Sequence, residues 1–247
     1  SQGIERVFMG GFAFMVLWGT WEAALLLKTL GLEGWKQIMA GAIFTALRVI
    51  VALILSLLWT VPIGVAIGRN PRLAKVLQPI VQIAASVPAT ALFPILLLFL
   101  AQLGGGLEIG SVALMMLGTM WYILFNVIAG AQSIPSDLFE VAKVYHLSLV
   151  QRWRVVILPS IFPYLITGII TAVGGAWNAS IVSEYVHFQG KTLTTNGLGS
   201  TISLATARGD YPVLLAATAV MSLLVVLTNR LVWRRLYKLA MEKYRLL

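Results

Sequence analysis

The sequence predicts an all-α, polytopic membrane protein with about six transmembrane helices and a long cytoplasmic loop between the fourth and fifth. Three properties of the 247 residues lead to this prediction: 59% are hydrophobic, only 11% are charged, and the mean hydropathy is +0.90. A soluble domain carries roughly a quarter charged residues, and a single water-facing globule could not hide so much apolar surface. The composition therefore excludes an ordinary soluble enzyme and a disordered chain.

Six stretches lack Asp, Glu, Lys and Arg, and each approaches the roughly 20 residues that a helix needs to cross a bilayer. They are residues 7–21, 49–67, 80–103, 109–131, 161–183 and 211–229. The first stretch reaches full length only by continuing past Glu22 to residue 27. Pro62, Pro88 and Pro94 fall inside the second and third stretches and predict interruptions of those helices.

The Lys and Arg residues set the predicted orientation, because cytoplasmic segments of membrane proteins carry an excess of them. With the N-terminus in the cytoplasm, thirteen of the 18 fall on the inner side and four on the outer side, and Arg48 lies near the start of the second stretch. We therefore expect both termini in the cytoplasm. The net charge of +9 is then a topology signal, and nucleic-acid binding is not expected. The inner residues are Arg6, Arg69, Arg72, Lys75, Lys143, Arg152, Arg154, Arg230, Arg234, Arg235, Lys238, Lys243 and Arg245, and the outer ones are Lys28, Lys36, Lys191 and Arg208.

The sequence offers no site for catalysis or for a metal ion. It contains no Cys and only two His, His146 and His187, and no carboxylate pair or Ser/His/Asp set has a plausible shared site. Gly190-Lys191-Thr192 looks like the tail of a phosphate-binding loop, but the Gly required five residues earlier is Tyr185. We therefore expect no catalytic residue, no bound cofactor and no metal in this chain.

The predicted inner loop, about residues 132–160, has the period of amphipathic helices. Ser136 is placed to cap a first helix, and a second pattern begins at Ser148 and stops at Pro159. We expect two short helices lying across the inner face of the membrane. An interfacial anchor with no partner is the alternative. Four apolar residues follow the i, i+3, i+4, i+7 spacing of one helix face: Leu138, Val141, Ala142 and Tyr145.

The same loop carries a spaced motif. Glu140-Val141-Ala142 is followed after three residues by His146, and after nine more by Val156-Ile157-Leu158-Pro159. This pattern resembles the cytoplasmic signature of bacterial ABC importer permeases, E-A-A-x3-G-x9-I-x-L-P. His146 stands where that family usually has Gly, which would end a helix with a positive φ. Because His also enters that region, we predict that His146 has a positive φ and ends the helix; the alternative is a different turn.

Further features resemble the nitrate, sulfonate, taurine and bicarbonate branch of that family. They are Pro88 and Pro94, Trp177-Asn178 followed after five residues by Glu184, and Gly197-Leu198-Gly199. The chain is also similar to the second half of longer, fused permeases of that branch. The resemblance implies one transmembrane domain over residues 1–247, with a coupling loop at about 132–160, an outer loop at about 184–210 and a basic cytoplasmic tail at about 230–247.

What the resemblance implies is a permease subunit of the bacterial inner membrane that forms the path for a small anion, such as nitrate, a sulfonate, taurine or bicarbonate. Two separate ATPase subunits would bind ATP and Mg, and their closure would move the docked inner helix. A second permease domain, a periplasmic or lipid-anchored binding protein and membrane lipid are the other implied partners. The implied coupling residues are Leu138, Glu140, Val141, Ala142, Tyr145, His146, Leu158 and Pro159.

Four residues inside the predicted spans are candidates for lining the path: Asn126, Trp177, Asn178 and Ser180. Polar groups are costly in a bilayer and mark functional sites by default. Hydrogen bonding between helices is the alternative for each polar group.

For several other residues the sequence predicts a location in the fold. Glu184, Gly197 and Gly199 belong to the outer face, and Glu184 is expected to be a structural or binding-protein contact because its charge would repel an anion. Arg48 is expected to snorkel to the interface. The Gly64-x3-Gly68 spacing favours close helix packing.

Two rival functions stay open at this point. One is a secondary transporter or channel that runs on an ion gradient, which would be expected to carry acidic residues deep in the bilayer. The other is a membrane scaffold with no transport.

Overall fold

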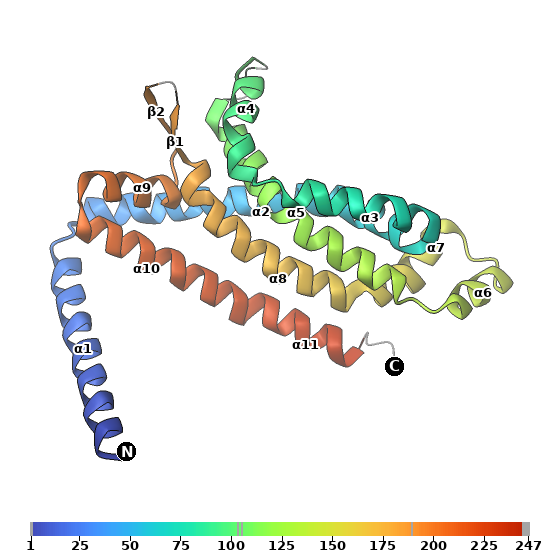
Figure 1. The fold of residues 1–247 in the computed structure, drawn as a ribbon, viewed down its shortest axis with the longest axis horizontal. Helices are drawn as coiled ribbons and strands as arrows, with labels where there is room; N and C mark the ends of the chain where they lie inside the picture. Colours follow the sequence, from blue (N-terminus) through green and yellow to red (C-terminus); the bar gives the residue numbers. More distant parts are fainter. Residues whose placement is uncertain (1, 103, 105, 189, 244–247) are drawn as a thin grey trace.

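The computed structural model describes residues 2–102, 104, 106–188 and 190–243, so Leu103, at the end of the third predicted stretch, and Arg245 lie outside the described residues. Four long helices lie side by side (Figure 1): α2 (Leu32–Arg69), α5 (Gly106–Gln132), α8 (Leu158–Ser183) and α10 (Tyr211–Thr228). Among the described residues, five helices are long and apolar enough to cross a membrane, or six if one bent pair is a single span. The predicted all-α polytopic fold is confirmed.

The two ends of the bundle carry different elements. One end carries α6 (Ser136–Val144) and α7 (Leu149–Arg152), and the other carries a hairpin and α9 (Leu198–Arg208) (Figure 1). We call the first the inner end and the second the outer end, after the orientation predicted from Lys and Arg.

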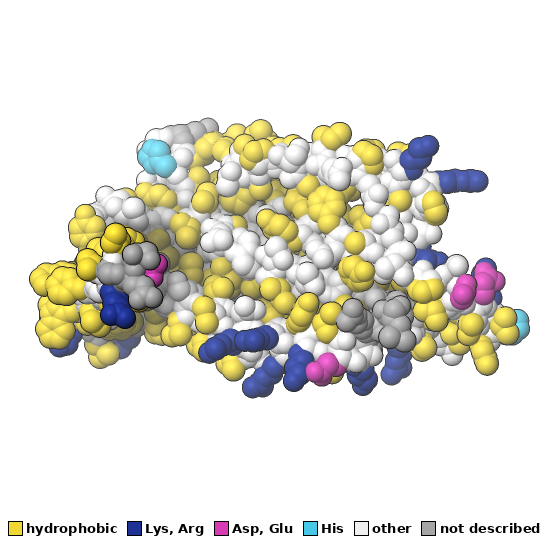
Figure 2. Space-filling view, turned by 60° about the horizontal axis from the view of Figure 1, so that its bottom comes forward, with side chains coloured by type: hydrophobic (Ala, Val, Ile, Leu, Met, Phe, Trp, Pro, Cys, Tyr) yellow, Lys and Arg dark blue, Asp and Glu magenta, His cyan; other side chains and the backbone are white. Residues whose placement is uncertain are grey.

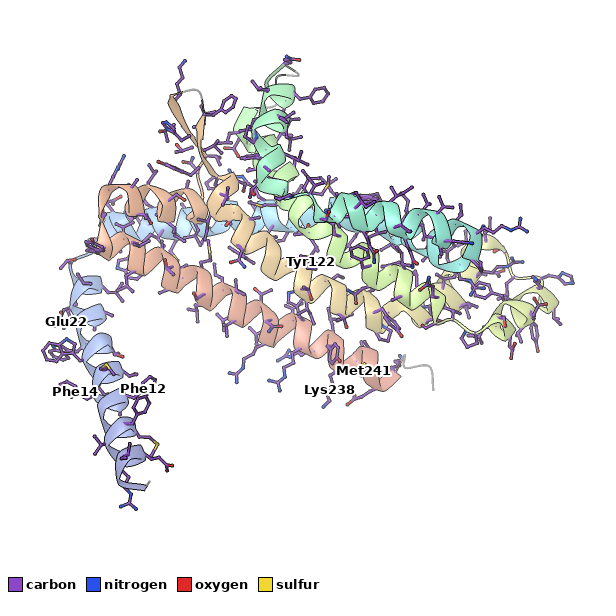
Figure 3. The ribbon with its side chains drawn as sticks, in the orientation of Figure 1. Phe12, Phe14, Glu22, Tyr122, Lys238 and Met241 are labelled. Atoms are coloured by element: carbon purple, nitrogen blue, oxygen red, sulfur yellow. The ribbon has the colours of Figure 1, made fainter. Side chains whose placement is uncertain are left out.

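Helix α1 (Gln2–Lys28) continues past Glu22 and diverges from the bundle (Figure 1). None of its apolar window is buried, and Phe12 and Phe14 project from opposite sides of it (Figure 3). The first predicted stretch is therefore long enough to span a bilayer. No other described part of the chain covers its apolar surface.

The third predicted stretch is broken. Helices α3 (Pro71–Ser86) and α4 (Ala89–Gln102) meet at an angle of 85°. Val87 is extended there, with φ −72° and ψ 124°, as expected for a residue that precedes proline. The predicted interruption at Pro88 is confirmed, whereas Pro62 and Pro94 lie inside continuous helices.

Small residues bring α2 against α5. A Cβ atom at Gly64 would lie 2.7 Å from Val127 Cγ1, and one at Gly68 would lie 2.6 Å from the carbonyl oxygen of Ile128. A larger side chain at either glycine would push the two helices apart. The close packing predicted from the Gly64-x3-Gly68 spacing is confirmed.

The inner loop differs from its prediction at Pro159. Helix α7 continues through a π-helical turn, η1 (Trp153–Ile157), into α8, so the second inner helix does not stop there and the prediction is wrong. The N–H of Leu158 donates to the carbonyl of Trp153, five residues back. Pro159 is the second residue of α8 and comes directly after this wider turn. The inner loop and the fifth span therefore form one helical rod.

The outer loop and the C-terminal segment are also structured. Strands β1 (Tyr185–Phe188) and β2 (Lys191–Thr194) pair antiparallel, with Tyr185 opposite Thr194. Helix α9 follows and ends at Gly209, which has φ 68°. After α10 the chain makes a second π-helical turn, η2 (Asn229–Trp233), before α11 (Arg234–Lys243). The region predicted as an outer loop is thus a hairpin and a helix.

Candidate functional site

Helix α6 ends in a tight hydrogen-bonded turn at His146. The φ of His146 is 50°, and no other non-glycine residue in the described part of the chain has a positive φ. Its N–H donates to the carbonyl of Lys143 (2.9 Å), and the N–H of Leu147 donates to that of Ala142 (2.9 Å). These two bonds form a Schellman motif, the common helix ending that places a left-handed residue at this position. The predicted conformation of His146 is confirmed.

The chain turns directly into the next helix. Ser148 caps α7 by accepting the N–H of Gln151, and the Gln151 side chain accepts the N–H of Ser148 in return. Such a capping box fixes the start of a helix. At the other end of α6, Ser136 is already inside the helix and makes no capping bond, so its predicted role as a cap is wrong.

The apolar residues of α6 do not form the single face that their spacing predicts. Leu138 and Ala142 pack into the core below, and Ala142 is only 1% exposed. Val141 and Tyr145 are exposed instead, at 51% and 75%. The exposed side also carries Glu140, whose carboxylate pairs locally with Lys143 (2.8 Å). Helix α6 therefore rests on the bundle with one face and presents an apolar and acidic face outward.

An arginine from α2 holds α6 in place. The Arg69 guanidinium lies 3.6 Å from the centre of the Phe139 ring, within the range of a cation–π contact. Arg69 Nη1 also donates to the carbonyl of Ile134 (3.1 Å), just before α6. Because Arg69 is the last residue of α2, these two contacts join α6 to the end of that long helix.

The outer end contains an ion network centred on the buried Arg48. The α2 helix is 38 residues, about 57 Å at 1.5 Å per residue, so it reaches beyond a bilayer core of about 30 Å. All three side-chain nitrogens of Arg48 donate hydrogen bonds. Nη1 donates to Glu184 (2.9 Å) and to the carbonyl of Asn196 (2.8 Å). Nη2 donates to Thr195 (2.6 Å) and to Glu108, and Nε donates to Glu108 as well (3.2 Å). Arg48 is 7% exposed, so the predicted snorkelling is wrong.

Glu184 lies at the centre of the same network and is fully buried. Besides Arg48, its carboxylate accepts from the Thr45 hydroxyl (2.8 and 3.0 Å) and from the N–H groups of Gly199 (2.8 Å) and Ser200 (3.4 Å). The last two belong to the second and third residues of α9, and the start of a helix favours negative charge. Glu184 is saturated by groups of its own chain and joins α2 to α9.

Gly197 and Gly199, at the start of α9, pack too closely against other atoms to carry a side chain. A Cβ atom at Gly197 would collide with the Glu184 carboxylate, and one at Gly199 would collide with the carbonyl oxygen of Ser180. Both positions therefore require a residue without a side chain.

The four predicted path residues divide into two groups. Trp177 and Ser180 pack in the interior, where the Ser180 hydroxyl donates to the carbonyl of Trp177 (2.7 Å). Asn178 is exposed, and Asn126 is half-buried, with its amide bonded to the carbonyl of Tyr122 (2.8 Å).

Asn178 continues a polar stripe along α8. Thr167, Thr171 and Asn178 are exposed at helical spacing, and Gly174 between them has no atom within 4 Å of an added Cβ. Tyr122, exposed on α5 (Figure 3), lies against the same helix near Gly175. We call Thr167, Thr171, Gly174 and Asn178 the α8 stripe.

A protein-family comparison matches residues 60–234 of this chain to the binding-protein-dependent transport system inner membrane component family. The match contains the end of α2 and every helix from α3 to η2. The chain belongs to this family.

Relatives within the family transport different compounds, as their names state. The chain is 35% identical over 123 residues to the bicarbonate transport system permease protein CmpB of Synechocystis sp., which covers 50% of this chain and 42% of that one. It is 30% identical over 137 residues to the nitrate import permease protein NrtB of Leptolyngbya laminosa, with 56% and 48% covered. It is 27% identical over 180 residues to the taurine transport system permease protein TauC of Escherichia coli, with 73% and 62% covered. The chain spans about half the length of the curated relatives it matches.

Among solved structures, the chain is similar to an inward-facing structure of the MetNI methionine ABC transporter. The TM-score is 0.68 at 20% sequence identity, and the similarity covers 85% of this chain and 99% of the other. This similarity shows that the two chains share a fold.

Within this family member, the structure brings together only part of what the sequence singled out. Glu184, Gly197 and Gly199 lie in one network, and the residues from Leu138 to His146 form one inner element. Leu158, 41% exposed, and the half-buried Pro159 lie beyond η1. Sequence reasoning missed the partners Thr45, Arg48, Glu108 and Thr195. One signal in the sequence could have indicated this network. Arg48 lies in a long apolar helix, three residues after Thr45, and a charged residue in such a place is expected to have a buried partner of opposite charge.

Proposed function

We propose that this chain is the membrane-spanning permease subunit of an ATP-driven importer for a small anion. The observation that carries the proposal is the outward face of α6, since it lies at the inner end, outside the bundle, and no described element covers it. In this proposal the chain forms the path for the anion and carries the helix, α6, that the ATPase subunits move. A separate pair of subunits binds ATP and Mg and hydrolyses the ATP.

The geometry of α6 supports a docking role. Val141, Val144 and Tyr145 of α6 are exposed, and so are Leu149 and Val150 of α7. Exposed apolar residues that gather in a patch mark interaction sites. An amphipathic helix in a groove is a recurrent recognition mode. Because α7 runs through η1 into α8 and Arg69 ties α6 to α2, force applied at α6 would reach two long helices.

The substrate class rests on the named relatives and on the α8 stripe. Bicarbonate, nitrate and taurine share an anionic group with several oxygens, and these are the compounds in the names of three relatives. The α8 stripe offers hydroxyl and amide groups and contains no acidic residue. Such a surface would not repel an anion. We assign Asn126 and Asn178 to the path and Trp177 and Ser180 to its support.

The remaining parts of the proposal concern assembly and topology. Both termini lie in the cytoplasm, a second permease domain covers the α8 stripe, and a binding protein delivers the substrate to the outer end. The closed Arg48 network gives that end a fixed surface, because breaking it would leave buried charges unpaired.

The test is co-purification of the chain with its ATPase subunits in mild detergent. We expect the native chain to retain ATPase activity and the double variant Val141→Glu/Tyr145→Glu to lose at least about nine-tenths of it, since apolar interface residues near the centre of a patch dominate binding. The matched control is Leu193→Glu, an exposed apolar residue of β2 at the outer end. Equal ATPase retention by all three chains would contradict the proposal.

A further inference from the structure

A pocket of about 300 Å³ lies between α8 and the C-terminal helical segment. This volume is at the lower end of the range for small-ligand sites. Five of its six lining residues carry a polar group, two of them belong to the α8 stripe, and most of the surface that they expose to the pocket comes from their apolar atoms. The lining residues are Thr167, Ile170, Thr171, Asn229, Arg234 and Tyr237.

The π-helical turn η2 assembles this pocket. The N–H of Arg234 donates to the carbonyl of Asn229, five residues back. In a regular α-helix, two residues five apart point to sides that differ by about 140°, whereas the wider π turn brings them onto one side. Asn229, Arg234 and Tyr237 therefore line the pocket together. Isolated π turns occur often at functional sites.

The charge in the pocket is positive. Arg234 has no ion-pair partner among the described residues, and no acidic residue is among the lining residues. Lys238, one turn further on, pairs with Glu242 at 3.7 Å and points away from α8 (Figure 3). Lys and Arg side chains also gather along the lower edge of the molecule in Figure 2, where this helical segment lies. Arg234 is thus a cation that faces polar groups without a counter-charge.

We propose that this pocket is a transit site for an anionic group with several oxygens, at the inner end of the path. The inference rests on the proposed function, which it deepens. The Arg234 guanidinium presents parallel N–H donors that match such a group, and the Tyr237 hydroxyl and the Asn229 amide add donors. Nitrate, bicarbonate, a sulfonate and the phosphate of a lipid headgroup share this chemistry.

The threonines complete the site. The Thr167 hydroxyl donates to the carbonyl of Pro163 (3.0 Å) and that of Thr171 to the carbonyl of Thr167 (3.1 Å). Both can turn toward an anion, because a helix carbonyl keeps its backbone N–H partner. With one cation and an exposed position, the site holds its ligand weakly enough to release it.

The experiment measures anion binding to the full chain in nanodiscs of phosphatidylcholine. The probes are isotope-labelled bicarbonate and methanesulfonate, followed by line broadening. We expect Arg234→Gln to weaken binding at least about tenfold, because it removes a charge-assisted pair, and Arg234→Lys to retain part of the affinity. Lys238→Gln, which removes one charge from the same helix outside the pocket, should bind as the native chain does.

The outcomes separate the possibilities. Native affinity in Arg234→Gln, or an equal loss in Lys238→Gln, would overturn the proposal. A parallel series in nanodiscs with phosphatidylglycerol identifies the source: if that lipid competes with bicarbonate in the native chain but not in Arg234→Gln, the pocket binds a headgroup at Arg234. If it does not compete, the ligand is the transported anion. Since ATPase retention depends on α6, native anion affinity in Arg234→Gln together with intact ATPase retention would reject this site and leave the permease role standing.

Discussion

The inner and outer ends of this molecule are built in opposite ways. At the outer end, Arg48 and Glu184 are buried and every nitrogen of Arg48 has a partner within the chain. At the inner end, Val144 and Tyr145 are about three-quarters exposed, and the one ion pair of α6, between Glu140 and Lys143, is exposed as well.

This contrast shows which end is complete on its own. Buried charges with all their hydrogen bonds made fix one arrangement, whereas exposed apolar side chains gain free energy only when a partner covers them. The outer end is therefore the rigid end of the chain, and the inner end leaves apolar side chains that no described residue covers.

Removing the buried carboxylate should have the largest effect. Glu184→Ala leaves Arg48 without one of its counter-charges and the start of α9 without an acceptor, so we expect a loss of about 3–5 kcal/mol of stability. Thermal unfolding of the purified chain in detergent measures it. Glu140→Ala, the same change at the inner end, should cost less than about 1 kcal/mol. Equal unfolding temperatures for the two variants would show that the two ends do not differ.

Replacing a glycine by alanine should lower stability where the glycine is tightly packed and leave it unchanged where there is space for a methyl group. Gly199→Ala places a Cβ atom against the backbone of Ser180, and we expect a loss of about 1–3 kcal/mol from overpacking. Gly174→Ala, on the α8 stripe, meets no atom within 4 Å and should be neutral or slightly stabilising. Unfolding curves of the two variants, recorded side by side, give the answer. A more stable Gly199→Ala chain would mean that α9 does not approach α8 this closely.

The turn after α6 should respond to backbone preference. His146→Val places a β-branched residue at a φ of 50°, which costs about 1–2 kcal/mol, and should lower ATPase retention because α6 is released from its turn. His146→Gly removes the strain and should keep or raise both stability and retention. Retention is measured by co-purification. The account of this turn fails if valine is tolerated as well as glycine.

The smallest effect is expected for the exposed pair on α6. Side-chain exposure is 67% for Glu140 and 61% for Lys143, so a double-mutant cycle with alanine should give a coupling free energy of less than about 0.5 kcal/mol. A coupling above about 1 kcal/mol would indicate that this pair is shielded from water and that the inner end is less open than its exposure indicates.

Features set by neighbouring residues could be predicted from the sequence. The α6 helix, its end at His146 and the break at Pro88 all follow from local spacing or backbone preference. The contacts of Arg48 could not be predicted, because its partners lie 60 to 148 residues away along the chain. Which side chains of α6 are buried could not be predicted either. Leu138 and Tyr145 are both apolar, and only the packing of the helix decides which of them is covered.

Two local features escaped prediction for a different reason. A proline often ends a helix, but here the chain continues from α7 through the π turn η1 into α8 and past Pro159. Strands β1 and β2 have four residues each, and neither alternates strictly between apolar and polar residues, so the pattern that identifies a half-buried strand is absent.

The most direct test of the central claim uses the absence of Cys from the sequence. A single cysteine introduced as Tyr145→Cys, labelled with a maleimide–benzophenone reagent in native membranes and illuminated, should form one covalent product whose mass is that of this chain plus an ATPase subunit. Leu193→Cys at the outer end should not form that product. If the position 145 label reacts only with lipid, or both positions give the same product, α6 is not the docking helix of an ATP-driven permease.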